Sequence, residues 1–153
     1  MAKKPTIADA QLIVQLYDLR REAEMRKARQ WWFAEFFPDS ADAFLKVSWA
    51  MGTQENAWLR QVIGYWSMAA SFVLQGALHE DLFLQPAFSG EMFLIYAKIC
   101  PFLKELREKL GDPEAFLNIE KATTRTKWGR YRLQFMLKRV EMMKQKRAES
   151  KKT

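Results

Sequence analysis

The chain of 153 residues is long enough for one hydrophobic core, and its 49% hydrophobic and 14% aromatic composition excludes disorder along its whole length. Only six Gly and five Pro residues are present, which excludes a β-rich fold with frequent turns, and the single Cys excludes an internal disulfide. The net charge of +7 arises at one end: residues 1–120 carry 13 Lys and Arg against 16 Asp and Glu, whereas residues 121–153 carry 12 against 2.

The first predicted helix begins at Thr6, where Asp9, three residues later, completes an approximate capping box. It is expected to run to about residue 36, because the residue before Pro38 is pushed out of the α region. Two adjacent tryptophans, Trp31 and Trp32, lie in its aromatic last turns. We expect them mainly to pack the first helix against the third. Since neighbours in a helix point about 100° apart, they are also candidate exposed aromatic residues.

A short second helix follows, capped by Asp39 or Ser40, and a third predicted helix spans residues 53–75. In this third helix apolar residues occupy more than one face, which is typical of a helix that is buried on several sides. We therefore expect it to form the centre of the fold, with Trp66 and Phe72 in the core.

Shorter elements are expected in the segment after the third helix. A helical turn is expected at residues 79–84 and a loop at residues 85–90. A helix over residues 91–110 should kink at Pro101, because proline removes one backbone hydrogen bond and crowds the preceding turn.

A last helical region runs from about residue 113 toward residue 147 and is expected to break at Thr123–Thr124 or at Gly129. Together these patterns predict an all-α protein, an irregular bundle of five or six helices. Its expected organisation is a helical bundle domain over residues 1–127, followed by a basic amphipathic C-terminal arm, residues 128–153, packed in part on the same domain.

The residue pattern of this C-terminal arm predicts a helix with one apolar stripe and many cations. The stripe consists of Leu133, Met136, Leu137, Val140 and Met143. The candidate polyanion-binding residues are Arg130, Arg132, Lys138, Arg139, Lys146 and Arg147, and Trp128 is a further candidate exposed aromatic residue. Three interpretations stay open: packing with a solvated outer face, binding of RNA, DNA or anionic lipid, and presentation of the helix to a protein groove.

Residues suited to catalysis or metal binding are few. His79 is the single histidine, no glycine-framed nucleophile accompanies it, and a surface or capping role is expected. Cys100 lies in an apolar helical stretch and is expected to be a core thiol. One histidine and one cysteine cannot form a zinc or di-iron centre, and the isolated glycines form no phosphate-binding loop. We therefore expect no catalytic, metal or cofactor-binding residue.

Several short segments resemble an uncharacterised bacterial family of small helical proteins over about residues 8–120. They are Tyr17–Glu22, Tyr65–Val73, Gly76, Leu78, Leu82–Phe83, Gly90–Glu91 and Gly111–Pro113. The resemblance implies a bacterial helical domain, cytosolic or membrane-associated, with no assigned activity and no catalytic residue to carry over. The chain after about residue 121 departs from the family pattern, so the resemblance does not account for the basic arm.

The sequence favours a non-enzymatic helical interaction or regulatory domain, with an unknown protein or a second copy of the chain as partner. The alternative is a polyanion-binding protein that holds nucleic acid or an anionic membrane surface through the basic arm. The longest apolar run, residues 62–74, is shorter than the roughly 20 residues that span a bilayer, so no transmembrane segment is expected. A cytoplasmic location is expected, with peripheral association with a membrane left open.

Overall fold

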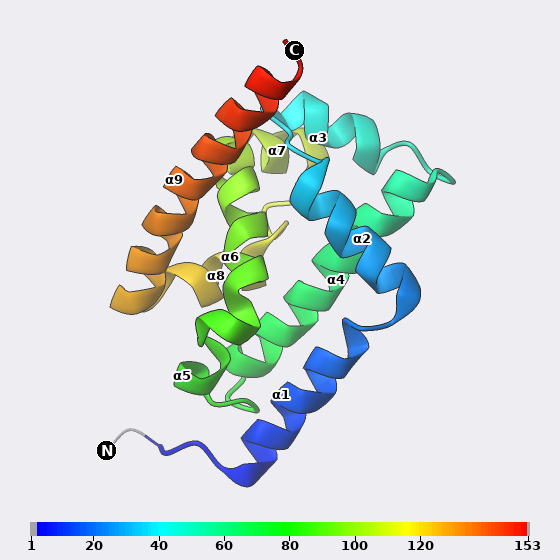
Figure 1. Ribbon diagram of the computed structural model, residues 1–153. Coiled ribbons are helices and arrows are strands. Elements are labelled where there is room, and N and C mark those ends of the chain that lie inside the picture. Colours follow the sequence, from blue (N-terminus) through cyan, green and yellow to red (C-terminus); the bar gives the residue numbers. More distant parts are fainter. Residues whose placement is uncertain (1–2, 153) are drawn as a thin grey trace.

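The computed structural model describes residues 3–152, and every regular element among them is a helix (Figure 1). The all-α prediction is therefore confirmed, but the structure contains more helices than the five or six expected. The helices are α1 (Ile7–Leu19), α2 (Ala23–Ala34), α3 (Ala41–Ser48), α4 (Gln54–Leu74), α5 (Glu80–Phe83), α6 (Pro86–Ile99), α7 (Leu103–Leu110), α8 (Leu117–Thr124) and α9 (Lys127–Ser150). A 3-10 turn, Cys100–Phe102, joins α6 to α7.

The long first helix expected up to residue 36 is in fact two helices, α1 and α2. At its start the expected capping box is present, because the Asp9 N–H donates to Thr6 Oγ1 (3.2 Å) and the Thr6 N–H donates to Asp9 Oδ2 (2.7 Å). The break follows Leu19. Glu22 then opens α2, since its carboxylate accepts the Met25 N–H at 2.9 Å and satisfies a donor that no helical carbonyl reaches.

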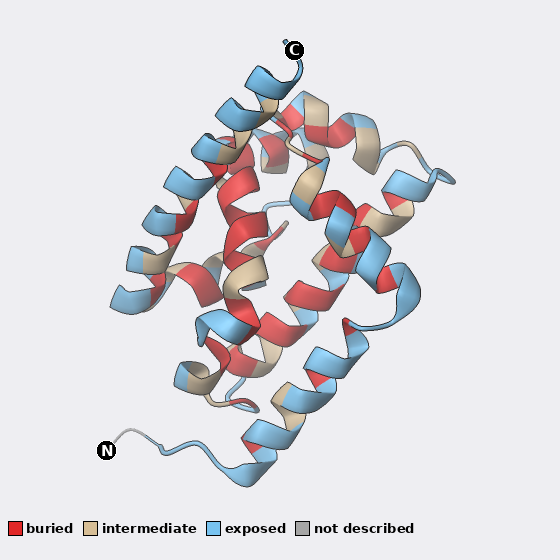
Figure 2. Ribbon diagram, in the orientation of Figure 1, coloured by how far each residue is buried: buried red, intermediate tan, exposed pale blue. Residues whose placement is uncertain are grey.

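The expectation that α4 is the central helix needs a correction, because α6 is the more enclosed of the two. Every residue of Met92–Ile99 is buried, whereas α4 leaves Gly64 and Met68 exposed. Helix α6 packs against α8 and α9, and α4 packs against α2, α3 and α8 (Figure 2). Of the two α4 residues expected in the core, Trp66 is fully buried and Phe72 is half-buried.

The loop expected at residues 85–90 is also wrong, because α6 already begins at Pro86. Proline is well tolerated at the first helical position, where its missing N–H would have no helical partner and its fixed φ suits the helix. Phe88 and Ser89, in the first turn, are buried. The local pattern of Gln, Pro, Ser and Gly is typical of a loop, and burial of this turn against the rest of the bundle overrides it.

The helix predicted around Pro101 is interrupted rather than kinked. The chain passes through the 3-10 turn and restarts as α7, which ends at Gly111 in the left-handed conformation (φ +65°). The next helix does not start at Pro113. Phe116 also has a positive φ of 62°, and α8 begins directly after it at Leu117.

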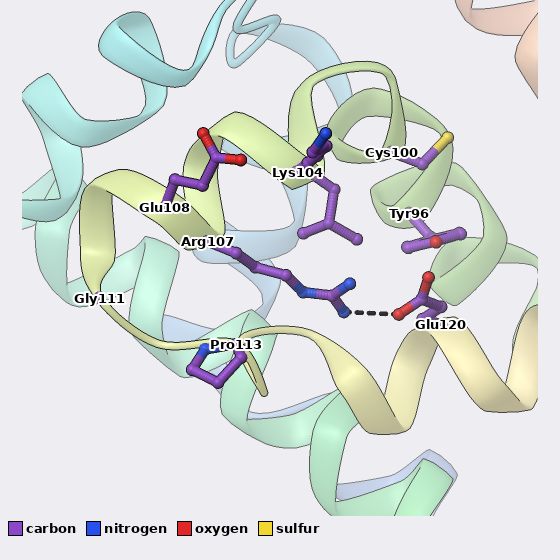
Figure 3. Close-up of a pocket in the computed structure, with 9 residues that line it drawn as sticks. Tyr96, Cys100, Lys104, Arg107, Glu108, Gly111, Pro113 and Glu120 are labelled. Atoms are coloured by element: carbon purple, nitrogen blue, oxygen red, sulfur yellow. Dashed lines mark hydrogen bonds and ion pairs between the residues drawn. The ribbon is translucent and has the colours of Figure 1, made fainter.

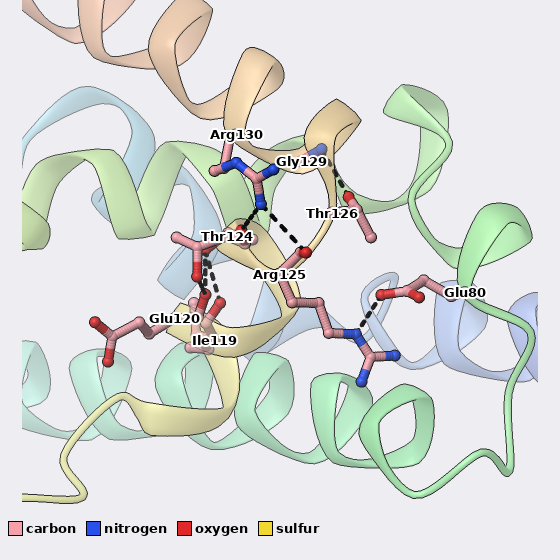
Figure 4. Close-up of polar contacts among 9 residues, drawn as sticks. Glu80, Ile119, Glu120, Thr124, Arg125, Thr126, Gly129 and Arg130 are labelled. Carbon is pink, nitrogen blue, oxygen red and sulfur yellow. Dashed lines mark hydrogen bonds and ion pairs between the residues drawn. The ribbon is translucent and has the colours of Figure 1, made fainter.

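The α8–α9 corner sets the direction of the last helix, and it lies beside the predicted break at Thr123–Thr124 (Figure 4). Thr126 caps α9 by accepting the Gly129 N–H at 2.9 Å. Arg130 folds back over the end of α8, where its guanidinium donates to the carbonyls of Thr124 (2.8 Å) and Arg125 (3.2 Å). These hydrogen bonds satisfy backbone carbonyls that the end of a helix leaves without a partner.

Gly129 permits a close approach in this corner, which leads to a testable prediction. A Cβ at Gly129 would lie 2.6 Å from the Thr123 carbonyl oxygen, a backbone atom, whereas a Cβ at Gly64 in the middle of α4 would meet open space. Gly129→Ala should therefore lower the free energy of unfolding by about 1–3 kcal/mol through overpacking. Gly64→Ala, the matched control, should raise it by about 0.5–1 kcal/mol through helix propensity. Urea titrations followed by circular dichroism measure both, and equal signs for the two variants would contradict the close approach.

A partly buried polar network joins α1, α2, α4 and α6. The Trp66 indole N–H donates to Glu91 Oε1 at 2.9 Å, and Arg29 Nε pairs with Glu91 Oε2 at 2.7 Å. Close by, the Tyr65 hydroxyl donates to the Leu16 carbonyl at 2.6 Å. Buried polar groups are costly unless they are paired, so this network favours one arrangement of the four helices over its alternatives.

Candidate functional site

The last helix has two sides of opposite character. Its inner side packs on α6 and α8, and Leu133, Met136 and Val140 belong to the same hydrophobic core as the rest of the bundle. The segment predicted as a basic arm is therefore an integral helix of the bundle along most of its length. Its outer side is free along one edge of the molecule and is exposed from end to end (Figure 2).

The outer side carries large apolar side chains as well as cations. Trp128, Tyr131, Phe135 and Met142 are 40%, 70%, 45% and 55% exposed. Their spacing of three, four and seven residues places them along one face of α9. We define the α9 stripe as these four residues together with the cations that fall among them at the same spacing, Lys138, Arg139 and Lys146.

The candidate cations divide into anchored and free ones. Arg130 is used to cap α8. Arg147 donates to the Ala34 carbonyl at 2.5 Å, which ties the end of α9 to the end of α2. Arg132 is half-buried with its guanidinium 4.8 Å above the Phe135 ring centre. Within residues 3–152, the side chains of Lys138, Arg139 and Lys146 have no hydrogen-bond or ion-pair partner, and all three are exposed.

Lys98 of α6 joins Arg147 at the end of α2. Its ammonium donates to the carbonyls of Trp32 and Phe36, the latter at 2.9 Å, and lies 3.6 Å from the centre of the Phe37 ring. Lys98 is 1% exposed. Desolvation, with Arg147 and Lys144 nearby, lowers its pKa to about 7. Cations at a helix C-terminus satisfy unpaired carbonyls and oppose the negative end of the helix dipole, so this cluster holds the bundle together.

Two of the three candidate exposed aromatic residues are buried, which corrects that expectation. Trp31 is 6% exposed and stacks on Phe36 with ring centres 4.4 Å apart, and Trp32 is 1% exposed. Trp31 also lies 6.2 Å from Trp58 of α4, so the pair packs α2 against that helix. Phe36, just after α2, contacts both indole rings, with its ring centre 4.4 Å from that of Trp31 and 5.0 Å from that of Trp32, which a helical wheel of the sequence does not show.

The aromatic residue of α2 that does reach the surface is Phe33, which is 46% exposed. It lines a shallow hollow of about 200 Å³ with Arg139, Met142, Met143 and Lys146. Phe33 therefore extends the α9 stripe onto a neighbouring helix. The sequence does contain a signal for the stripe, since Trp128, Tyr131, Phe135 and Met142 form a second apolar row, but for Phe33 it contains none.

A larger hollow of about 530 Å³ lies among α6, α7 and α8 (Figure 3). Arg107 pairs with Glu120 at 2.5 Å and donates to the Ala115 carbonyl at 3.1 Å. Burial raises the pKa of the Cys100 thiol to about 11, and burial beside Glu120 also raises the pKa of Tyr96. Both groups therefore stay protonated at neutral pH. These residues come from α6, the 3-10 turn, α7, α8 and the loop before α8, and no motif in the sequence links them.

His79 has a structural position at the start of α5. Its backbone N–H donates to Asp9 Oδ1 at 2.8 Å, and its ring contacts the Lys3 carbonyl. Hydrogen bonds from Thr6 chiefly, and from His79, lower the pKa of Asp9 to about 2. Among residues 3–152, no group of three or more His, Cys, Asp or Glu side chains is placed to hold a metal ion.

Comparison with known protein families matches residues 5–128 to a domain of unknown function (DUF4760). The chain belongs to this family. The DUF4760 region covers α1 to α8 and ends at Trp128, in the first turn of α9, so nearly the whole α9 stripe lies beyond it. No curated protein and no solved structure shows a significant match to the chain.

The DUF4760 match confirms the predicted resemblance to an uncharacterised family. Several segments on which that resemblance rests meet in the structure, since Tyr65–Val73 contributes Trp66 and Gly90–Glu91 contributes its hydrogen-bond partner. Arg20, from Tyr17–Glu22, is 4% exposed and lies 5.4 Å from the Trp66 ring centre. Trp66 and Arg20 therefore lie in the interior of the bundle, whereas Tyr17, Leu19 and the Gly111–Pro113 segment are exposed.

Across residues 3–152, no helix combines the length and the apolar character needed to cross a bilayer. The apolar run at residues 62–74 belongs to α4, where much of it packs in the core.

Proposed function

We propose that this DUF4760 protein is a non-enzymatic binding domain that holds a polyanion on the outer face of α9. The observation that carries the proposal is the set of three exposed cations, Lys138, Arg139 and Lys146, which have no acidic partner within residues 3–152. Glu141 of the same helix lies closer to Lys144, at 3.8 Å. Unpaired cations at successive turns create a positive potential that attracts phosphates and other anions.

A binding role, rather than a catalytic one, is supported by the chemistry of the larger hollow. Its thiol, Cys100, has a pKa near 11, and thiolate rather than thiol is the nucleophile in cysteine chemistry. Its guanidinium, Arg107, already has two partners. His79 is held at a helix start by contacts to Asp9 and Lys3.

The proposal predicts that reversing three charges abolishes binding. Binding of a fluorescent 20-nucleotide RNA to the full chain is measured by anisotropy at 50 mM salt. The variant Lys138→Glu, Arg139→Glu, Lys146→Glu should lose at least tenfold in affinity. For the parent, three engaged cations imply a fall of roughly 20-fold between 50 and 200 mM salt, by the counterion relation for single strands.

A matched control distinguishes the effect of these three cations from the effect of the overall net charge. Arg21→Glu, Arg26→Glu, Lys46→Glu makes the same change of charge at three exposed cations outside α9 and should retain most of the affinity. Equal losses in the two triple variants would mean that net charge alone matters, and the proposed site would then be wrong. A parent that binds neither RNA nor heparin nor anionic lipid at low salt would overturn the function itself.

A further inference from the structure

The α9 stripe combines two features that a merely solvated helix face does not require. Lys138, Arg139 and Lys146 supply positive charge, while Tyr131 and Met142, 70% and 55% exposed, place apolar surface beside it. Lysine and arginine side chains alone would be enough to keep this face of α9 solvated. Exposed aromatic and thioether side chains cost free energy in water unless another surface covers them, so the stripe is suited to contact with another surface.

The form of the stripe favours a flat anionic surface over a nucleic acid strand. Single-stranded nucleic acids bind in positively charged grooves with aromatic faces open for stacking. The stripe instead follows the outside of one helix at the edge of the molecule (Figure 1). One face of the Phe135 ring already has the Arg132 guanidinium over it at 4.8 Å, and Trp128 lies edge-on to Phe93 with ring centres 6.0 Å apart.

A membrane surface matches both features. Helices that lie in the plane of a bilayer interface carry Trp, Phe or Leu on the side that enters the headgroup region and Lys or Arg beside them. Tyr and Trp are enriched at that level, and juxtaposed cations contact lipid phosphates. Helix α9 spans 24 residues, which corresponds to about 36 Å at 1.5 Å per residue, and residues 121–153 carry 12 cations against 2 anions.

We infer that the polyanion is the surface of an anionic lipid bilayer, on which α9 lies lengthwise as a peripheral anchor. Trp128, Tyr131, Phe135 and Met142 enter the headgroup region, and Lys138, Arg139 and Lys146 contact the lipid phosphates. Phe33 adds an apolar contact from α2. The inner side of α9 stays in the core, so binding needs no unfolding of the bundle. This inference rests on the proposed function, because both use the same three cations.

The test compares charge and apolar surface on the full chain. Flotation is measured with vesicles of phosphatidylcholine containing 30% phosphatidylglycerol and with vesicles of phosphatidylcholine alone. The parent should float with the first and not with the second. The charge-preserving variant Tyr131→Ser, Met142→Ser should lose at least tenfold in affinity for the anionic vesicles, because interfacial binding scales with the apolar area that is buried. Ile7→Ser, Val14→Ser, at apolar residues of α1 that are 80% and 67% exposed, is the matched control and should bind like the parent.

The possible results distinguish the inference from the proposed function. If Tyr131→Ser, Met142→Ser binds anionic vesicles as well as the parent, contact is electrostatic only and the bilayer anchor is wrong. If the parent binds the 20-nucleotide RNA at 50 mM salt and fails to bind the vesicles, the membrane anchor is wrong, but the proposed polyanion binding is retained. If the parent binds neither RNA nor vesicles nor heparin, the membrane anchor and the proposed function are both wrong. Circular dichroism of each variant verifies that the bundle is folded.

Discussion

Replacing Trp66 with alanine is expected to lower the free energy of unfolding by about 3–5 kcal/mol, the usual range for emptying a buried aromatic site. Trp66 is 0% exposed and packs edge-on against Tyr65 and Phe88, with ring centres 5.0 and 5.7 Å away. Its indole N–H also donates to Glu91, which is paired with Arg29. The substitution therefore creates a cavity and disturbs a partly buried polar network at the junction of α4 and α6.

Two further variants separate packing from hydrogen bonding at this site. Trp66→Phe keeps an aromatic ring but removes the N–H, so Glu91 loses one donor and the cost should be about 1–3 kcal/mol. Phe72→Ala, at a half-buried residue of the same helix, should cost less than Trp66→Ala. Chemical unfolding followed by circular dichroism gives all three values. A loss below about 1 kcal/mol for Trp66→Ala would contradict its place in the core.

Replacing Lys98 with methionine is expected to lower the free energy of unfolding by about 2–3 kcal/mol at pH 9. Methionine keeps much of the apolar stem, but the carbonyls of Trp32 and Phe36 at the end of α2 lose their donor, and an unpaired buried carbonyl is costly. Because Lys98 is almost fully enclosed, water cannot easily replace its amino group as a donor. The end of α2 should therefore loosen together with the Arg147 contact beside it.

The same residue gives the protein a pH dependence of defined sign. The pKa of Lys98 is lowered from 10.5 to about 7 by desolvation first and by Arg147 and Lys144 second. Between these values the unfolded chain binds more protons than the folded one, so the contribution of Lys98 to stability increases as pH rises from 7 toward 10. It is fully present above the unfolded pKa and is lost as pH falls toward 7. The slope is at most about 1.4 kcal/mol per pH unit.

Unfolding curves of the parent and of Lys98→Met at pH 7, 8 and 9 measure this effect. The difference in free energy of unfolding between the two proteins should widen as pH rises. Lys138→Met, at an exposed lysine of α9, is the control and should stay within about 0.5 kcal/mol of the parent at each pH. A constant difference across the series would show that Lys98 keeps an ordinary pKa in the folded protein.

Local chemistry in the sequence correctly predicted the helix starts that depend on neighbouring residues alone. Thr6, Ser40 and Thr53 each accept a backbone N–H three residues later, a contact that needs no other part of the chain. Gly111 ends α7 because a residue without a Cβ readily takes a positive φ. Local signals of this kind, with the shortage of turn residues, determined the all-helical class.

Packing between distant segments decided what these local signals could not. The turn at Pro86 to Ser89 is helical because the bundle buries Phe88 and Ser89, and Trp31 and Trp32 are buried because α2 packs on α4 and Phe36 contacts both indole rings. Lys98 lies within an apolar run, and among residues 3–152 the hydrogen-bond partners of its amino group all lie at the nearby end of α2. The hydrogen bonds of Lys98 join residues more than 60 positions apart, which periodicity along one helix cannot reveal.

The charge of residues 121–153 was fully determined by the sequence, but its distribution in space was not. The sequence groups six candidate cations in one basic segment, yet Arg130 caps α8, Arg147 caps α2 and Arg132 lies over the Phe135 ring, while Lys138, Arg139 and Lys146 remain exposed. The physical reason is that helix ends leave carbonyls unpaired, and a cation within reach of such an end is used there. Which helix end lies within reach depends on how α9 crosses the bundle, and that is a property of the tertiary structure alone.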